Sequence, residues 1–382
     1  MINPSSNFWT DLFREFEEDR KNWYGKENWD TQRFGKYQPN PFLYLLYIIN
    51  SHLPRKFVII PGGYIDMLTA TNPMSGFSIL QEISNTYDIY KDEFSKSLLI
   101  KLIVFRILGP HKIKLPLAGN MAELNKKIIV ANSMICDDDV IKLDFSNWRL
   151  NRFKLSPIGF NIVCYSTPGG IINNFILKQY EYSKNNLIIT PNEGDYIIDA
   201  GGCWGDTALF FSEMVGGSGK VFSFEFLPEN IEIFRKNISL NEKLGDRITI
   251  IPYALSDKSG DTITYHYNGP GTSIKSRKTQ KKLHKNQTVT TITIDDFVKE
   301  NELDRVDFIK MDIEGSELNA LKGAVKTIQE FRPKLAISVY HNFQDLSEIP
   351  NFIRQLNLNY LFFLDHFTVH LDETVLFAVP RE

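Results

Sequence analysis

Asp195-Tyr196-Ile197-Ile198-Asp199-Ala200-Gly201-Gly202-Cys203-Trp204-Gly205-Asp206-Thr207 is the stretch that decides the fold. Apolar, β-branched residues lead to an acid, three glycines follow within five positions, and the last two residues can cap a helix. This pattern is typical of a buried parallel strand that turns tightly into a helix. The glycines allow positive φ angles and let a ligand lie against bare backbone.

The chemistry of this loop favours one kind of ligand. The dinucleotide-binding pattern G-x-G-x-x-G is absent. The acid before the glycines, Asp199, would repel a pyrophosphate but suits a ligand with an ammonium group. S-adenosylmethionine carries an ammonium group together with a ribose diol and an adenine. Taken alone, the loop also fits an ordinary structural turn between a strand and a helix.

Length and composition limit the possible classes of protein. The 382 residues predict one large domain or two ordinary ones, and 43% hydrophobic content suffices for a packed core. A formal net charge of −3 gives no electrostatic footprint for nucleic acid, so we expect no such partner. The three cysteines have neither metal-site nor disulfide spacing, which fits a reducing compartment.

Nothing in the sequence predicts membrane insertion. The most apolar run, residues 98–108, is far shorter than the roughly 20 residues that span a bilayer. The N-terminus lacks the charged and apolar regions of a signal peptide. We therefore expect a cytoplasmic protein without a transmembrane segment.

The first 155 residues have a globular composition but show no chemistry. Their patterns predict an amphipathic helix over 8–24, a short strand over 57–60 and a core helix over 94–108. Strand-like patterns follow between 140 and 165. We expect residues 1–155 to recognise the acceptor or to mediate homo-oligomerisation, and residues 156–382 to form a second domain.

In that second region, strands alternate with helices. A helix is expected over 175–182, and core strands are expected over 195–200, 221–226, 248–251, 306–311, 335–339, 361–363 and 374–379. A polar insertion adds two antiparallel strands, 262–265 and 289–294, around a Lys-rich segment, 275–285, that should be mobile. The final two strands are joined by a short loop. The pattern predicts an α/β fold whose mostly parallel sheet ends in an antiparallel hairpin.

Polar residues fall where the parallel strands end, which is where open sheets bind ligands. Glu225 follows the strand next to Asp199, and its carboxylate can accept two hydrogen bonds from a ribose diol. Ala254-Leu255-Ser256 offers backbone groups and a small wall for a flat base. Asp312 and Glu314 follow a further strand, where clustered acids are compatible with acid/base chemistry or a divalent metal ion.

Four motifs occur in a fixed order, and they are Ile198–Thr207, Phe224–Asn230, Ala254–Asp257 and Lys310–Glu317. Together they resemble the FkbM family of S-adenosylmethionine-dependent methyltransferases, over roughly residues 175–379. Further family-like features are Gln179–Tyr182, Thr293–Phe297, Tyr340-His341 and Glu373–Leu376. The resemblance implies a class I methyltransferase, Rossmann-like fold and, most often, O-methylation of a hydroxyl on a sugar, glycan or natural product.

The resemblance also implies a cofactor site. By position, Asp199, Gly201 and Gly205 would hold the methionine end of S-adenosylmethionine, and Glu225 would bind the ribose. Ala254 and Leu255 would contact the adenine. The remaining residues of the implied site are Gly202, Trp204, Thr207, Phe226 and Asp312. The acceptor is not transferred with the family, because the first 150 residues match no family that we can name.

Methyl transfer to a hydroxyl requires alignment of donor and acceptor and a group that takes the hydroxyl proton. His341 has an ordinary pKa suited to a general base, and Asp312 and Glu314 are the other candidates. These three could instead bind a magnesium-like ion that acidifies the hydroxyl. His366 and His370, between the last two strands, could line the acceptor side.

Two classes of function fit these observations. One is an enzyme that methylates a small-molecule or glycan acceptor, and the other is a catalytically silent, cofactor-binding scaffold subunit. The complete glycine loop, Glu225 and the acidic cluster favour the enzyme. Among enzymes, N-methylation is the alternative to O-methylation, and the sequence does not decide between them.

Overall fold

The fold is seen in a computed structural model of the chain, which describes residues 6–29, 36–38, 44–45, 73–115, 121–143, 148–265, 269–272 and 287–381. The strand expected over 57–60 and the Lys-rich segment 275–285 lie outside these residues. None of the helices in the described ranges combines the length and the apolar character needed to cross a bilayer.

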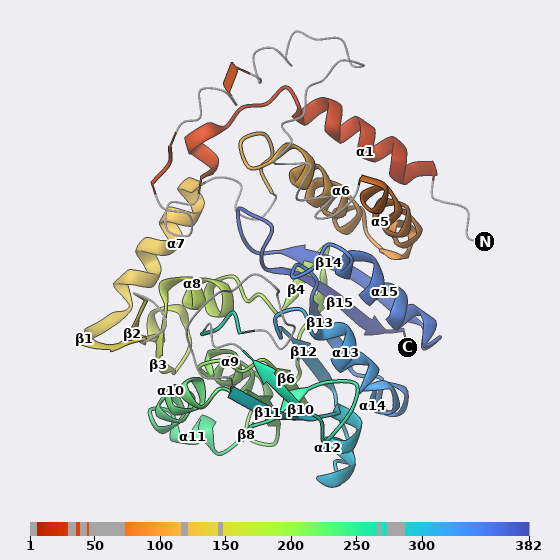
Figure 1. Ribbon diagram of the computed structural model, residues 1–382. Coiled ribbons are helices and arrows are strands. Elements are labelled where there is room, and N and C mark those ends of the chain that lie inside the picture. Colours follow the sequence, from red (N-terminus) through yellow and green to blue (C-terminus); the bar gives the residue numbers. More distant parts are fainter. Residues whose placement is uncertain are drawn as a thin grey trace.

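A seven-stranded sheet forms the centre of the C-terminal region (Figure 1). In spatial order its strands are β14 (Tyr360–His366), β15 (Thr374–Pro380), β13 (Lys334–Ser338), β12 (Phe308–Met311), β6 (Tyr196–Ala200), β7 (Lys220–Phe224) and β8 (Ile248–Ile251). The strands from β13 to β8 are parallel, whereas β15 runs antiparallel to both β13 and β14. The mostly parallel sheet with its terminal antiparallel hairpin is confirmed, and with it the class I methyltransferase-like fold.

Helices cover both faces of this sheet, which is why the parallel strands are continuous apolar runs. Ile197 packs into one core with α9 (Asp206–Val215) and α10 (Pro228–Ser239). Its neighbour Ile198 belongs to a core on the opposite face. The C-terminal helices on that second face are α12 (Ile294–Glu300), α13 (Glu317–Lys322), α14 (Val325–Phe331) and α15 (Asp345–Gln355).

The N-terminal helices join this second core. They are α1 (Ser6–Asp19), α5 (Pro73–Thr86) and α6 (Glu93–Leu108), and they lie over the β14 end of the sheet (Figure 1). The expected core helix over 94–108 is confirmed, whereas the helix expected over 8–24 already ends at Asp19. The backbone N–H of Leu364 donates to Ser95 Oγ at 2.9 Å. Described residues on both sides of the predicted domain boundary therefore share one hydrophobic core.

A second N-terminal group lies beside the glycine loop. It comprises α7 (Met121–Ser133), the antiparallel strands β1 (Ile135–Lys142), β2 (Arg149–Lys154) and β3 (Val163–Ser166), and α8 (Pro168–Ile171). Asn237 of α10 fixes β3, because its side chain accepts from the Tyr165 N–H (2.7 Å) and donates to the Tyr165 carbonyl (3.0 Å). The helix expected over 175–182 is wrong: a π-helical turn ends at Ile176, and Lys178 takes a φ of +50°.

The polar insertion follows β9 (Ala254–Leu255). Its strands β10 (Thr262–Tyr265) and β11 (Gln287–Ile292) pair antiparallel as expected, and β11 also pairs parallel with β9. The second strand was expected to continue to Ile294 but ends at Ile292. Thr293 instead caps α12, since its side chain accepts a hydrogen bond from the Asp296 N–H.

Candidate active site

The glycine loop packs tightly against its surroundings. Gly201 and Gly205 have φ angles of +87° and +84°, which side chains rarely adopt. A Cβ atom on Gly201 would lie 2.0 Å from the Asp312 carbonyl oxygen, and one on Gly205 would lie 2.1 Å from the Phe234 ring. These two glycines are therefore required by the protein's own packing, whatever ligand the loop holds.

Asp199 lies beneath the loop in a buried polar network. Its Oδ1 is 3.0 Å from Lys310 Nζ, and its Oδ2 accepts hydrogen bonds from Thr207 (3.1 Å) and Ser223 (2.7 Å). Lys310 also donates to the Gly201 carbonyl at 2.7 Å. Burial lowers the pKa of Lys310, but nearby carboxylates, Asp199 foremost, outweigh burial and raise it. This ion pair, with the hydrogen bond to the Gly201 carbonyl, ties the loop to β12.

Neither Asp206 nor Thr207 caps α9, contrary to expectation. The helix begins at Asp206, and Gly205 occupies the N-cap position without a side-chain bond. The Thr207 hydroxyl donates to Asp199 instead. Asp206 Oδ2 accepts hydrogen bonds from Ser166 Oγ and Asn174 Nδ2, each at 3.1 Å. Both side chains therefore connect the start of α9 to its neighbours.

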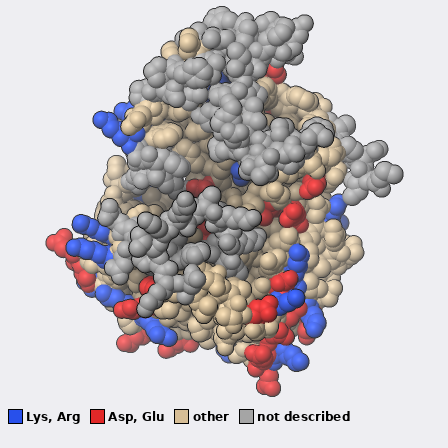
Figure 2. Space-filling view, viewed as in Figure 1, with Lys and Arg blue, Asp and Glu red and all other residues tan. Residues whose placement is uncertain are grey.

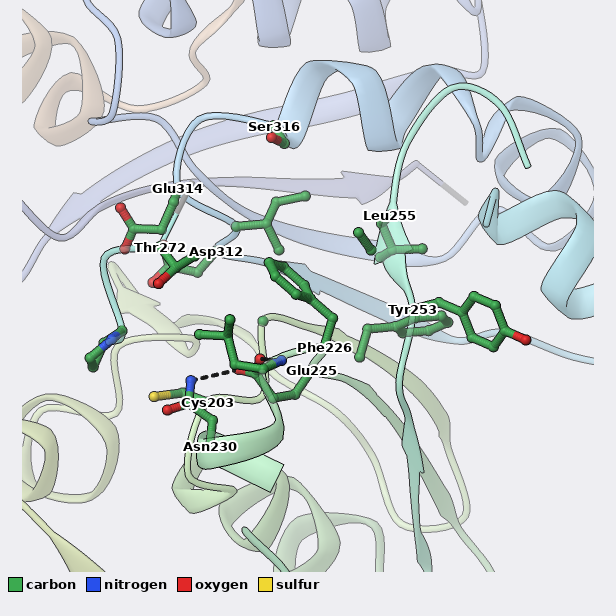
Figure 3. A pocket seen from close by; sticks show the side chains of 16 residues that line it. Cys203, Glu225, Phe226, Asn230, Tyr253, Leu255, Thr272, Asp312, Glu314 and Ser316 are labelled. Atoms are coloured by element: carbon green, nitrogen blue, oxygen red, sulfur yellow. Dashed lines mark hydrogen bonds between the residues drawn. The ribbon is translucent and has the colours of Figure 1, made fainter. Parts of the chain in front are cut away.

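A small cavity, which we call the cofactor cavity, lies at the carboxyl ends of β6, β7 and β12 and has a volume of about 70 Å³ (Figure 3). Glu225 and Asn230 lie on one side of it, and Asp312 and Glu314 lie on another (Figure 3). Of the predicted cofactor-binding residues, the structure places in this wall Gly201, Glu225, Phe226, Ala254, Leu255 and Asp312. Strand ends far apart in the sequence thus meet as predicted.

Glu225 is buried and held in place by the start of α10. Its Oε1 accepts from the Leu227 N–H (2.8 Å), and its Oε2 accepts from Asn230 Nδ2 (3.1 Å). Burial raises the pKa of Glu225 to about 7, although these hydrogen bonds oppose the shift. Trp204 supports the arrangement, because its indole N–H donates to Asn230 Oδ1 at 3.2 Å. Hydroxyl donors of a ribose would favour the ionised carboxylate.

A larger cavity of about 560 Å³, which we call the acceptor cavity, adjoins the first one. The residues that line both are Gly201, Cys203, Pro270 and Asp312. Trp204, Thr207 and Lys310 lie on the wall of the acceptor cavity, with Phe367, Thr368 and Glu373 from the β14–β15 loop. His366, the last residue of β14, and His370 of that loop are buried and line neither cavity.

Asp312 is the charged side chain that the two cavities share. Its Oδ2 accepts from the Tyr180 hydroxyl (2.8 Å), and its Oδ1 accepts from the Tyr340 hydroxyl (3.1 Å). Glu314, two residues on, has a φ of +56° and lines only the cofactor cavity. Burial is the main reason that the pKa of Glu314 is raised to about 7. Asp312 is therefore the predicted catalytic carboxylate that reaches the acceptor side.

His341 lies behind this wall and lines neither cavity. Its Nε2 is 3.5 Å from both Asp312 Oδ1 and Glu314 Oε2, and its Nδ1 is 3.1 Å from Glu317 Oε1. Burial lowers the pKa of His341, but the three carboxylates outweigh burial and raise it to about 10. The ring is then cationic at neutral pH. These observations favour a role in positioning Asp312, and the predicted role as general base stays a prediction.

Glu317 is a member of this cluster that the sequence reasoning left out of its candidates. It is fully buried, and its Oε1 accepts from the N–H groups of Ile313 (2.8 Å) and Gly315 (3.3 Å). Glu317 follows Asp312 and Glu314 closely in the sequence, at the expected start of a helix, and this spacing could have identified it as a member of the cluster.

Asp312, Glu317 and His341 each offer one ligand atom within 4.8 Å of the others. They nevertheless fit a metal ion poorly. Glu317 Oε1 already accepts two backbone hydrogen bonds and lies 3.1 Å from His341 Nδ1, so the candidate ligand atoms contact one another directly. Ion pairing explains this cluster.

Comparison with known proteins agrees with the geometry. Residues 189–362 match the family model described as the methyltransferase FkbM domain. The hexuronic acid methyltransferase AglP of Haloferax volcanii is 30% identical over 148 residues, which cover 37% of this chain and 55% of that protein. The methyltransferase sdnD of Sordaria araneosa is 26% identical over 176 residues, 39% of this chain and 66% of that protein. The chain thus spans between about half and two thirds of these curated relatives.

Solved structures include similar proteins. A crystal structure of a methyltransferase FkbM from Methylobacillus flagellatus KT is 20% identical, with a TM-score of 0.48, over 79% of this chain and 60% of that one. Fibrillarin from Aeropyrum pernix with S-adenosylmethionine is 15% identical, with a TM-score of 0.33, over 64% of this chain and all of that one. Residues 189–362 are thus similar to the FkbM methyltransferase domain, as the sequence motifs predicted.

Proposed function

We propose that the chain is an S-adenosylmethionine-dependent O-methyltransferase that acts on a hydroxyl of a sugar, glycan or natural product. The observation that carries this proposal is the meeting of two cavities at Gly201 and Asp312. One cavity offers the predicted groups for a nucleoside, and the other has room for an acceptor. S-adenosylmethionine would supply a methyl group on a positively charged sulfur. The similarity to AglP, which is named a hexuronic acid methyltransferase, supports a sugar as the acceptor.

In this proposal the cofactor cavity holds the nucleoside end of the donor. The Glu225 carboxylate accepts the hydroxyls of the ribose, and the end of β9 at Ala254 and Leu255 contacts the adenine. The methionine end lies along the glycine loop. Asp199 lines neither cavity, so we propose that it acts through Lys310 and Thr207 to hold the loop in place.

Asp312 is our proposed proton acceptor. With S-adenosylmethionine bound, the acceptor hydroxyl oxygen would take the methyl group, and the sulfur would keep the electron pair of the broken carbon–sulfur bond. The hydroxyl proton passes to a carboxylate at the junction of the cavities, which is the position of Asp312. Tyr180 and Tyr340 orient this carboxylate through their hydroxyl groups. This arrangement favours a hydroxyl over an amine as the acceptor. A neutral hydroxyl must lose its proton during the transfer, whereas an amine that is already deprotonated can attack without a nearby base.

The N-terminal region contributes to the acceptor side. Leu124 and Ile128 of α7 and Trp148 and Arg149 at the start of β2 line the acceptor cavity. This placement supports acceptor recognition as its role, while homo-oligomerisation and a cytoplasmic location stay predictions.

Acidic and basic side chains are interspersed over the lower part of the face in Figure 2.

Two measurements test the proposed function. Calorimetry with S-adenosylhomocysteine should show binding, which the Glu225→Ala substitution weakens. Incubation of a panel of sugars and glycans with a labelled methyl donor should then transfer label to a hydroxyl. Absence of binding at millimolar S-adenosylhomocysteine would overturn the proposal. Binding without transfer to any acceptor would favour the silent scaffold.

A further inference from the structure

We infer that the acceptor cavity contains an anion-binding subsite at Arg149, and that the acceptor is therefore a sugar bearing a carboxylate or a phosphate. This inference rests on the proposed methyltransferase function and adds the charge of its acceptor. It concerns the wall of the cavity that α7 and β2 supply, which lies outside the matched family domain at 189–362.

The other charged side chains on this wall have partners within the protein. Lys310 is in the buried ion pair with Asp199. Asp206 and Asp312 each accept two side-chain hydrogen bonds. Glu373 Oε2 accepts a hydrogen bond from Gln179 Nε2 at 2.6 Å. These four side chains are thus held in place by contacts within the protein.

Arg149 differs from all of these. Its side chain is exposed, and its guanidinium makes no hydrogen bond or ion pair with any residue that the structure describes. Arg149 also stands directly opposite Lys142 in the β1–β2 ladder, so two like charges face each other across the strands. Like charges directly opposite each other are destabilising, and a bound anion would reduce this repulsion. A bound carboxylate or phosphate would give the guanidinium a partner and would reduce the repulsion between Arg149 and Lys142.

The surroundings of Arg149 fit a sugar ring. The planar fork of its guanidinium matches the two oxygens of a carboxylate or phosphate. Trp148 beside it is 53% exposed and lines the same cavity, as do Leu124 and Ile128 of α7. An apolar wall next to one fixed cation suits a ligand with a C–H face and an anionic substituent.

Binding to the full-length protein saturated with S-adenosylhomocysteine tests this inference. Calorimetry would measure the affinities of three ligands, which are D-glucuronate, D-glucose 1-phosphate and D-glucose. Each ligand would be titrated into the parent protein, Arg149→Gln and Arg149→Lys, and into Arg235→Gln as the control. Arg235 is an exposed arginine of α10 that lines neither cavity. At least one anionic sugar should bind about tenfold or more tightly than glucose. Arg149→Gln should remove this preference, Arg149→Lys should keep part of it, and Arg235→Gln should retain it.

Each outcome decides something. Tighter binding of glucuronate identifies the carboxylate as the recognised group, and tighter binding of glucose 1-phosphate identifies the phosphate. Equal binding of glucose and both anions, or a preference that survives Arg149→Gln, would overturn the inference. Binding of S-adenosylhomocysteine without any anionic sugar would overturn the inference alone. Failure to bind S-adenosylhomocysteine would instead overturn the proposed function.

Discussion

The two cavities of this protein differ in how they are built. The cofactor cavity is lined largely by residues at strand ends of the C-terminal region, where short motifs in chain order mark each contribution. The acceptor cavity takes a wall from α7 and β2, whose residues carry no motif. If the two cavities hold donor and acceptor as we propose, the sheet positions the donor site, whereas acceptor recognition depends on elements of ordinary composition. The predictions below test this division, from the largest expected effect to the smallest.

Asp312→Asn should separate chemistry from donor binding most strongly. The amide keeps the shape of the carboxylate but cannot accept a proton, so turnover should fall by about 10²–10⁴-fold. The affinity for S-adenosylhomocysteine should fall by a much smaller factor, although Asp312 also lines the cofactor cavity. Single-turnover kinetics with calorimetry on the same samples measures both. Glu373→Gln, on the wall of the acceptor cavity, is the matched control and should lower turnover much less than Asp312→Asn does. If Glu373→Gln lowers turnover more than Asp312→Asn, Glu373 is the proton acceptor instead.

Glu225→Gln should weaken donor binding without unfolding the protein. Losing charge-assisted hydrogen bonds to the ribose should cost roughly 1.5–3 kcal/mol of binding free energy. Glu232→Gln, on an exposed position of α10, is the control and should bind as the parent does. Calorimetry with S-adenosylhomocysteine measures the difference. Parental affinity in Glu225→Gln would remove this residue from the donor site.

His341 offers a test through the pH dependence of turnover. A general base with a pKa of about 10 would make the rate rise about tenfold per pH unit up to that value. If His341 only positions Asp312, the rate should hardly change between pH 8 and 9.5. His341→Gln should then lower the rate by a smaller factor than Asp312→Asn does, and the pH dependence of the rate should stay the same. A steep rise that disappears in His341→Gln would restore the histidine as base.

Donor affinity should also depend on pH, through Glu225. Its pKa in the folded protein is about 7, above the ordinary 4.5, so below pH 7 the carboxyl group is largely protonated. Because the ionised form accepts both ribose hydroxyls, affinity for S-adenosylhomocysteine should rise between pH 6 and 7.5 and then level off, by up to about tenfold. Calorimetry across this range measures the change. An affinity that is independent of pH in the parent, or equally dependent in Glu225→Gln, would contradict the assignment.

The smallest expected effect is that of a chelator. Asp312, Glu317 and His341 are arranged as ion pairs, so turnover should be unchanged when metal-free protein is assayed with a chelator. Loss of turnover that magnesium or manganese restores, and that Glu317→Gln impairs, would show that the cluster holds an ion after all.

The sequence predicted the strand ends well because their signals are local. A strand, a glycine loop and a following acid lie within a few residues of one another, and parallel strands bring such ends to one edge of the sheet. Contacts between distant segments had no such signal. Lys310 reads as an ordinary strand residue, and only the packing of β12 beside β6 shows that it pairs with Asp199.

The same reason explains what was missed at the acceptor side. Arg149 and Trp148 have no recognisable pattern in the sequence, since their role depends on where β2 lies relative to the glycine loop. His341 was expected to face the ligand because it follows a strand. Its surroundings of three carboxylates come from a neighbouring turn and helix, which a strand-end argument does not include.

The contact between α6 and β14 has a consequence for the synthesis of the chain. Ser95 and Leu364, whose hydrogen bond joins these elements, are 269 positions apart. At roughly 5–20 residues per second, a ribosome completes β14 on the order of tens of seconds after α6. Throughout that interval α6, whose Leu98 and Ile103 are buried in the native protein, lacks β14, one of the elements against which it packs. We therefore expect the nascent chain to depend on chaperones that bind apolar segments, and its yield to fall sharply when they are depleted.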